Sequence, residues 1–116
     1  MLFVVPLIVF VGCAVVFGTT LAAARGRLRV NHLAGMRFPH VMASPEAWQA
    51  GHRAALMPVT VGCALAMGSI VVPLVMGPTE DAMAIWAIGS MVALLFGTLV
   101  GAWRADQAAT DVLGSS

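Results

Sequence analysis

The stretch AALMPVTVGCALAMGSIVVPLVMGPT, residues Ala54 to Thr79, decides the fold, because it runs for 26 residues without a charged side chain. An α-helix rises about 1.5 Å per residue, so about 20 apolar residues cross the roughly 30 Å hydrocarbon core of a bilayer. A helix inside a water-soluble domain seldom needs an uncharged run of that length. We therefore expect this stretch to form a membrane-spanning helix.

Two further uncharged runs flank it, one of 24 residues from Met1 to Ala24 and one of 22 residues from Ala82 to Trp103. Only 9% of the 116 residues are charged and 60% are hydrophobic, whereas about 25% of an ordinary globular protein is charged. Such a chain has too few polar side chains to cover a water-soluble surface. We predict an all-α membrane protein, a single domain over 1–116, with three transmembrane helices near 1–24, 45–77 and 82–104.

The first run has an alternative interpretation as a cleaved signal peptide, because the small residues Ala22 to Ala24 are typical of a cleavage site. A signal peptide needs a basic segment before an apolar core of about 7–15 residues. No basic residue precedes Arg25, and the apolar run is longer than such a core. We expect a retained membrane helix.

The arginines predict the orientation, since the chain has no lysine. Five lie between the first two apolar runs and one follows the third, whereas the other loop, PTED, carries two acids: Arg25, Arg27, Arg29, Arg37, Arg53 and Arg104. Cytoplasmic loops are enriched in arginine, so we expect a cell-membrane protein with its first loop and C-terminus in the cytoplasm and its N-terminus outside. The run RGRLR could instead bind nucleic acid, but contact with anionic headgroups is favoured. The expected partner is the lipid bilayer, with no nucleic acid.

Small residues recur at four-residue spacing along two of the predicted helices. One row is Gly89, Ala93, Gly97 and Gly101, and the other is Ala14, Gly18 and Ala22, continued by Gly26. In lipid, such rows let helix backbones approach closely. We predict that they pack helices within the bundle or against a partner chain.

The loop between the first two helices is the most polar part of the sequence. Ser44, Pro45 and Glu46 suit a helix start as cap, first helical residue and acid in the first turn. Trp48 and His52 then share one face, which predicts a short amphipathic helix over 45–56 with Trp48 at the membrane interface. Pro39 should keep RFPH extended. The polar tail after Arg104 should be frayed.

Reactive chemistry has little support in this loop. His32, His40, His52 and Glu46 could in principle hold zinc, but they match no ligand signature such as HExxH. Ser44 is favoured as a helix cap over a nucleophile. Cys13 and Cys63 lie inside predicted helices without a CxxC motif and are interpreted as small buried hydrophobic residues. We expect no catalytic residue, no metal and no cofactor.

The order of residues in the loop resembles the signature of the SdpI-like family of small bacterial membrane proteins. That signature reads approximately N-x-x-x-G-[IM]-R-T-P, then S-x-E-x-W, then H-R. The matching residues here are Asn31, Gly35, Arg37, Pro39, Ser44, Glu46, Trp48, His52 and Arg53. The family's usual threonine is replaced by Phe38, which removes a hydroxyl beside Arg37.

The resemblance implies a non-catalytic role. The family's namesake protects a cell from its own secreted peptide toxin and signals by holding a repressor at the membrane. In this chain, the Arg37 guanidinium would suit a lipid phosphate or Glu46, while Trp48 and His52 would anchor the loop at the headgroups. The alternative is a structural accessory subunit of a larger membrane complex. Either role allows a protein partner in or at the membrane.

Overall fold

The computed structural model describes residues 3–31, 35–36 and 38–114, and this part of the chain forms four helices and no strand. They are α1 (Val4–Ala24), α2 (Pro39–Met42), α3 (Pro45–Met76) and α4 (Glu80–Gly114). Helices α1, α3 and α4 are long and apolar enough to cross a membrane, with mean hydropathies of 2.4, 2.2 and 2.1. The predicted all-α fold with three membrane-spanning helices is confirmed.

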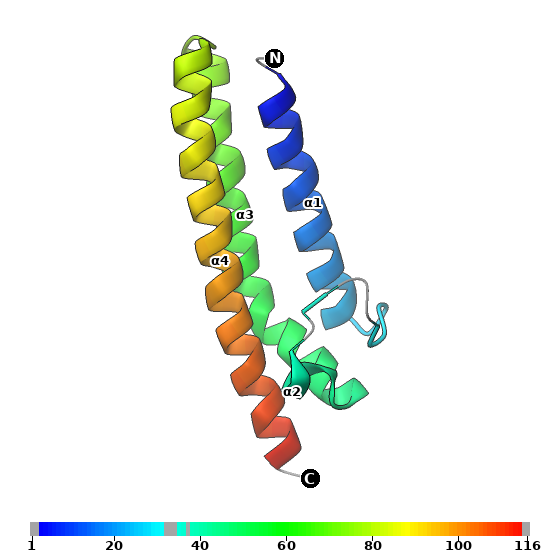
Figure 1. Ribbon diagram of the computed structural model, residues 1–116. Coiled ribbons are helices and arrows are strands. Elements are labelled where there is room, and N and C mark those ends of the chain that lie inside the picture. Colours follow the sequence, from blue (N-terminus) through cyan, green and yellow to red (C-terminus); the bar gives the residue numbers. More distant parts are fainter. Residues whose placement is uncertain (1–2, 32–34, 37, 115–116) are drawn as a thin grey trace.

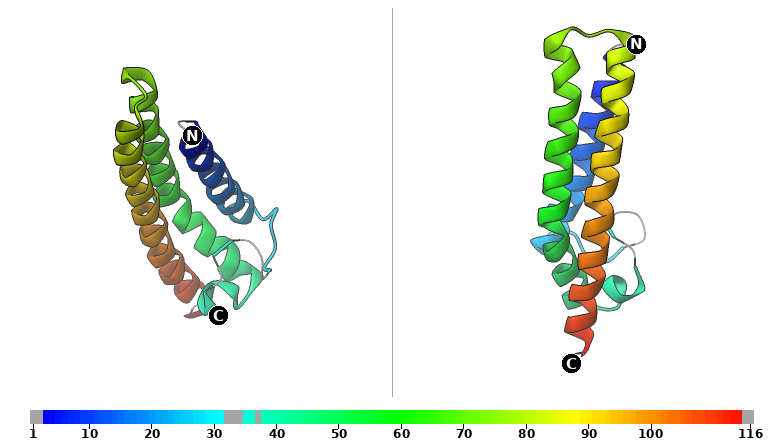
Figure 2. Two further views of the ribbon diagram at one scale, coloured as in Figure 1. Left: turned by 45° about the horizontal axis from the view of Figure 1, so that its top comes forward. Right: turned by 90° about the vertical axis from the view of Figure 1, so that its left-hand side faces the viewer.

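Helices α3 and α4 form a long antiparallel hairpin, and α1 packs mainly on α3 (Figures 1 and 2). The N-terminus lies near the α3–α4 turn, whereas α2 and the C-terminus lie at the opposite end, called here the loop end (Figure 1). The bundle extends 55 × 20 × 18 Å. It is therefore longer than a bilayer with its headgroups, about 40–45 Å, and one end must extend beyond the membrane.

Glycine brings α3 and α4 into backbone contact. A β-carbon added to Gly97 would lie 2.8 Å from the Cα atom of Gly62 and 2.8 Å from the carbonyl oxygen of Pro58. One added to Gly101 would lie 3.1 Å from Val59. The predicted contact through Gly97 and Gly101 is thus found in the hairpin, where small residues let the backbones approach.

The same row places Ala93 in the hairpin contact but leaves Gly89 outside it. A β-carbon on Gly62 would lie 3.1 Å from the carbonyl oxygen of Ala93, whereas no described atom lies within 4 Å of one added to Gly89. Ser90 takes the contact position instead, since its hydroxyl is buried and donates to the Ala66 carbonyl at 2.8 Å. At this level the two helices are joined by a side-chain hydrogen bond rather than by a glycine contact.

The middle of the small-residue row of α1, at Ala14 and Gly18, lies on the exposed side of the helix. Ala14 and Gly18 are exposed, Ala22 is half-buried, and no described atom lies within 4 Å of a β-carbon added to Gly18. For Ala14 and Gly18, contact with a partner chain stays a prediction. The buried face of α1 contains small residues too, among them Cys13 and Ala23, so small side chains alone could not identify it.

Cys13 and Cys63 meet across the α1–α3 interface. Both are buried and free, and each Sγ atom lies within 3.9 Å of the other residue's carbonyl oxygen. This agrees with their interpretation as small buried residues, because a cysteine occupies little space between two helices.

Helix α4 continues to Gly114, so the expected helix end at Arg104 and the frayed tail are both wrong. Ala105 and Ala109 are fully buried. A β-carbon on Gly51 of α3 would approach the Ala105 carbonyl oxygen to 3.2 Å. The tail extends the four-residue spacing of small residues, and burial of this face stabilises the extra helical turns.

Within RFPH, the described residues 38–40 are only partly extended. Phe38 is extended, with φ −82° and ψ 149°, but Pro39 begins the four-residue helix α2, which contains His40. Proline favours the first position of a helix, while the preceding residue stays extended. Val41 anchors α2, because it is fully buried and lies 3.2 Å from a β-carbon added to Gly51.

Candidate functional site

The candidate site is the loop end of the bundle, where the first turns of α3 contact the polypeptide that follows α1. The Ser44 hydroxyl accepts a hydrogen bond from the Ala47 amide at 3.0 Å, and Pro45 and Glu46 occupy the first turn of α3. This is the capping arrangement expected from the sequence. It fixes where α3 begins, and so places Trp48 and His52 one turn apart on the same face.

Trp48 and His52 lie inside the loop end. Trp48 is 2% exposed and His52 is fully buried, with ring centroids 4.3 Å apart. The Trp48 indole donates to the Leu28 carbonyl at 2.8 Å. These contacts correct the expectation that Trp48 and His52 face the headgroups, since both side chains bind polypeptide instead.

Both ring nitrogens of His52 are used within the chain. Nε2 accepts a hydrogen bond from the Met36 amide at 2.9 Å, and Nδ1 lies 2.7 Å from the Trp48 carbonyl oxygen. Because a backbone amide can only donate, Nε2 must carry the lone pair and Nδ1 the proton. The ring is therefore a neutral imidazole that ties Met36 to α3.

Gly35 completes this arrangement, and Gly35, Met36, Trp48 and His52 are together called the loop core. Gly35 has φ +91°, a conformation that favours glycine. A β-carbon there would lie 2.7 Å from Trp48 Cη2 and 2.9 Å from His52 Nε2. The glycine, tryptophan and histidine of the sequence pattern are thus explained by one packing contact.

Arg53 and Gln49 join α3 to the end of α1. Arg53 Nε and Gln49 Nε2 both donate to the carbonyl oxygen of Ala24, at 3.1 and 3.2 Å. Carbonyls in the last turn of a helix lack partners within the helix, and a cation there also favours the helix dipole. Sequence reasoning gave Gln49 no role, although its position four residues before Arg53 places both on one face.

The remaining pattern residues lie around the loop core. The Asn31 side-chain amide donates to the Arg29 carbonyl at 2.7 Å. Pro39 and Glu46 are exposed, and no ion pair of Glu46 is found among the described residues. Arg37 lies outside the described residues, so its contact with phosphate or Glu46 stays a prediction.

The zinc alternative is not assembled by the described residues. His52 belongs to the loop core, and His40 Nδ1 lies 2.8 Å from Asp106 Oδ1 on α4. Over residues 3–31, 35–36 and 38–114, no three His, Cys, Asp or Glu side chains gather where they could share a metal ion. His32, the fourth candidate ligand, lies outside those ranges.

These features define a multi-pass membrane protein with a folded loop at one end of its helices. The profile of the SdpI/YfhL protein family matches residues 27–105, more than half of the 116-residue chain. The chain therefore belongs to the SdpI/YfhL family. The match includes the loop core, α2, α3 and most of α4, whereas α1 precedes it. Comparisons with curated proteins and with solved structures gave no match.

Proposed function

We propose that this protein is a non-catalytic immunity protein of the cell membrane that protects its cell from a secreted peptide toxin and signals through its first loop. Membership of the SdpI/YfhL family supports the membrane role. The observation that carries the proposal is the loop core, in which the polar groups of Trp48 and His52 bind the chain itself. The pattern residues then build a rigid surface rather than a reactive centre.

The side chains exposed on that surface are the ones available to a partner. Phe38 is 42% exposed beside α2, and Glu46 is exposed in the first turn of α3. Aromatic side chains are enriched in the core of protein interfaces, whereas polar and charged side chains lie at the rim. Signalling would therefore depend on Phe38 and Glu46, and stability on the loop core.

The proposal includes the orientation deduced from the arginines. Arg25, Arg27 and Arg29 are exposed at the loop end, whereas Glu80 and Asp81 are exposed at the α3–α4 turn. The loop end would face the cytoplasm. A green fluorescent protein fused to the C-terminus should fluoresce and alkaline phosphatase fused there should be inactive. The opposite result would reverse the orientation.

The direct test is a toxin challenge of the bacterium that carries this gene. A deletion strain would be exposed to spent medium from the parent strain, and the gene returned as wild type, Glu46→Lys or Trp48→Ala. Wild type should restore growth. Glu46→Lys should reach the wild-type protein level without protecting, whereas Trp48→Ala should lower the protein level itself.

Two outcomes would contradict the proposal. Equal sensitivity of the parent and deletion strains would exclude immunity to a toxin in that medium. Full protection by Glu46→Lys, at a normal protein level, would leave Glu46 without the proposed signalling role.

A second candidate function is that of an accessory subunit in a larger membrane complex. The observation favouring it is the exposed face of α1, where Ala14 and Gly18 leave room for another helix. Mass spectrometry of the protein purified in mild detergent would show a large stoichiometric partner if this function is correct. A protein without such a partner would argue against it.

A further inference from the structure

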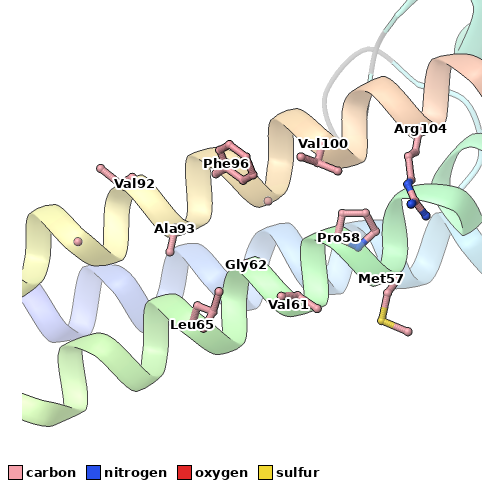
Figure 3. A pocket seen from close by; sticks show the side chains of 12 residues that line it. Met57, Pro58, Val61, Gly62, Leu65, Val92, Ala93, Phe96, Val100 and Arg104 are labelled. Atoms are coloured by element: carbon pink, nitrogen blue, oxygen red, sulfur yellow. The ribbon is translucent and has the colours of Figure 1, made fainter.

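An apolar groove follows the line where α3 and α4 meet, and it is called here the α3–α4 groove (Figure 3). Its volume is about 590 Å³. Gly62 and Gly97 contact each other through their backbones and contribute no side chains, so the hairpin is hollowed at this level. The walls are apolar side chains from both helices: Val61, Leu65, Val92, Phe96 and Val100.

One charged residue borders the groove, at its loop end. The Arg104 side chain extends from α4 toward Met57 and Pro58 of α3 (Figure 3). Arg104 is exposed, and no acidic side chain of the described residues forms an ion pair with it. The groove therefore combines an apolar channel with a guanidinium that is available to an anion.

The length of the groove matches one leaflet of a bilayer. Along α4 it runs from Gly89 to Arg104, and 104 − 89 = 15 residues of α-helix rise about 22 Å. Half of a bilayer with its headgroups is also about 20–22 Å. A transmembrane helix would need a contact surface through both leaflets, so the dimensions favour a lipid.

We propose that the α3–α4 groove binds an acyl chain of an anionic phospholipid from the leaflet at the loop end, with the lipid phosphate held by Arg104. A guanidinium binds phosphate through two parallel charge-assisted hydrogen bonds. The apolar walls contact the acyl chain. An ammonium-bearing headgroup would place a second cation near Arg104, so phosphatidylglycerol should bind better than phosphatidylethanolamine.

The experiment uses the full chain in dodecyl maltoside, with phosphatidylglycerol or phosphatidylethanolamine added and bound lipid detected by native mass spectrometry. Wild type should retain one phosphatidylglycerol. Arg104→Gln should weaken its retention about tenfold, the change expected for losing a charge-assisted hydrogen bond. Arg27→Gln is the matched control, because Arg27 is exposed in the first loop and does not border the groove.

A second variant fills the groove without disturbing the hairpin. Gly89→Leu should abolish lipid retention while preserving helical content by circular dichroism, because no described atom lies within 4 Å of a β-carbon at Gly89. Gly68→Leu is its control, since Gly68 is equally open and lies outside the groove. A folded Gly89→Leu protein with wild-type lipid retention would overturn the proposal.

Three other results would also overturn it. Equal retention of phosphatidylglycerol by wild type and Arg104→Gln would exclude the phosphate contact. Equal retention of the two lipids by wild type would exclude the anionic preference. A wild-type dimer that Gly89→Leu converts to monomers would identify the occupant as a second copy of the chain.

Discussion

Gly35 lies so close to Trp48 that a single added carbon would not fit, since a β-carbon on Gly35 would come within 2.7 Å of Trp48 Cη2. The neighbouring Met36 amide is at the same time bound to His52 Nε2. Two residues of the first loop thus fit closely against two residues of α3, which lie one turn apart. These residues of the loop pattern therefore stabilise the folded structure of the loop end.

Gly35→Ala should therefore destabilise the protein. The added methyl group would clash with the Trp48 ring, and alanine would also have to adopt a positive φ. The backbone strain alone costs about 1–3 kcal/mol. Thermal unfolding in detergent would measure the loss. Gly68→Ala is the control, because Gly68 has no described neighbour within 4 Å of an added β-carbon, and alanine also favours a helix. Equal midpoints for the two variants would contradict the packing role of Gly35.

Much of the fold could be predicted because the length of an uncharged run indicates whether a helix can cross the bilayer. The 26-residue run from Ala54 to Thr79 and the two runs around it correspond to α3, α1 and α4. The helical conformation of the tail was missed because its polar residues suggested a frayed segment exposed to solvent. Burial of Ala105 and Ala109 decides its conformation instead, and Ala105 lies against Gly51 in the first turns of α3.

The sequence was sufficient to assign the loop to a family, but not to predict which parts of the molecule its side chains contact. The sequence placed Trp48 and His52 on one face of a helix, which is correct, but this face contacts Gly35 and Met36 rather than headgroups. A one-dimensional pattern does not distinguish a face covered by lipid from one covered by the preceding loop. The order glycine, tryptophan, histidine in the sequence was the one signal that could have indicated this contact.

Gly97→Leu should disrupt the α3–α4 hairpin, whereas Gly89→Leu should leave it folded. A β-carbon at Gly97 would lie 2.8 Å from backbone atoms of α3, which cannot move independently. Overpacking typically costs about 1–3 kcal/mol, and separation of the helices would also release the Ser90 to Ala66 hydrogen bond. Thermal stability and elution volume in detergent would compare the two variants. If the two variants had the same thermal stability and elution volume, the predicted difference between Gly97 and Gly89 would be excluded.

Trp48→Phe should destabilise the protein while preserving most of the packing. Phenylalanine keeps an aromatic ring but cannot donate to the Leu28 carbonyl, which now accepts at 2.8 Å. An acceptor left without a partner costs about 1–3 kcal/mol. Unfolding in sodium dodecyl sulfate, followed by circular dichroism, would measure the free energy. A wild-type value would show that water replaces the indole without loss.

Gln49→Ala and Arg53→Ala should each have a small effect, and together a larger one than their sum. Both side chains donate to the Ala24 carbonyl, so either can still satisfy it when the other is removed. The double variant removes both side-chain donors of the Ala24 carbonyl, with an expected loss of about 1–2 kcal/mol. A double-mutant cycle on the free energy of unfolding measures this coupling. Strict additivity would mean that the two contacts act independently.

Ala109→Leu should destabilise the loop end, whereas His40→Ala should have little effect. Ala109 is fully buried, so a larger side chain must displace the residues packed around it, at about 1–3 kcal/mol. The His40–Asp106 pair is short at 2.8 Å, but its side chains are 55% and 47% exposed, and exposed pairs contribute about 0–1 kcal/mol. Proteolysis of the C-terminal turns should accelerate in Ala109→Leu alone. Faster cleavage in His40→Ala would instead mean that the His40–Asp106 contact holds the end of α4 in place.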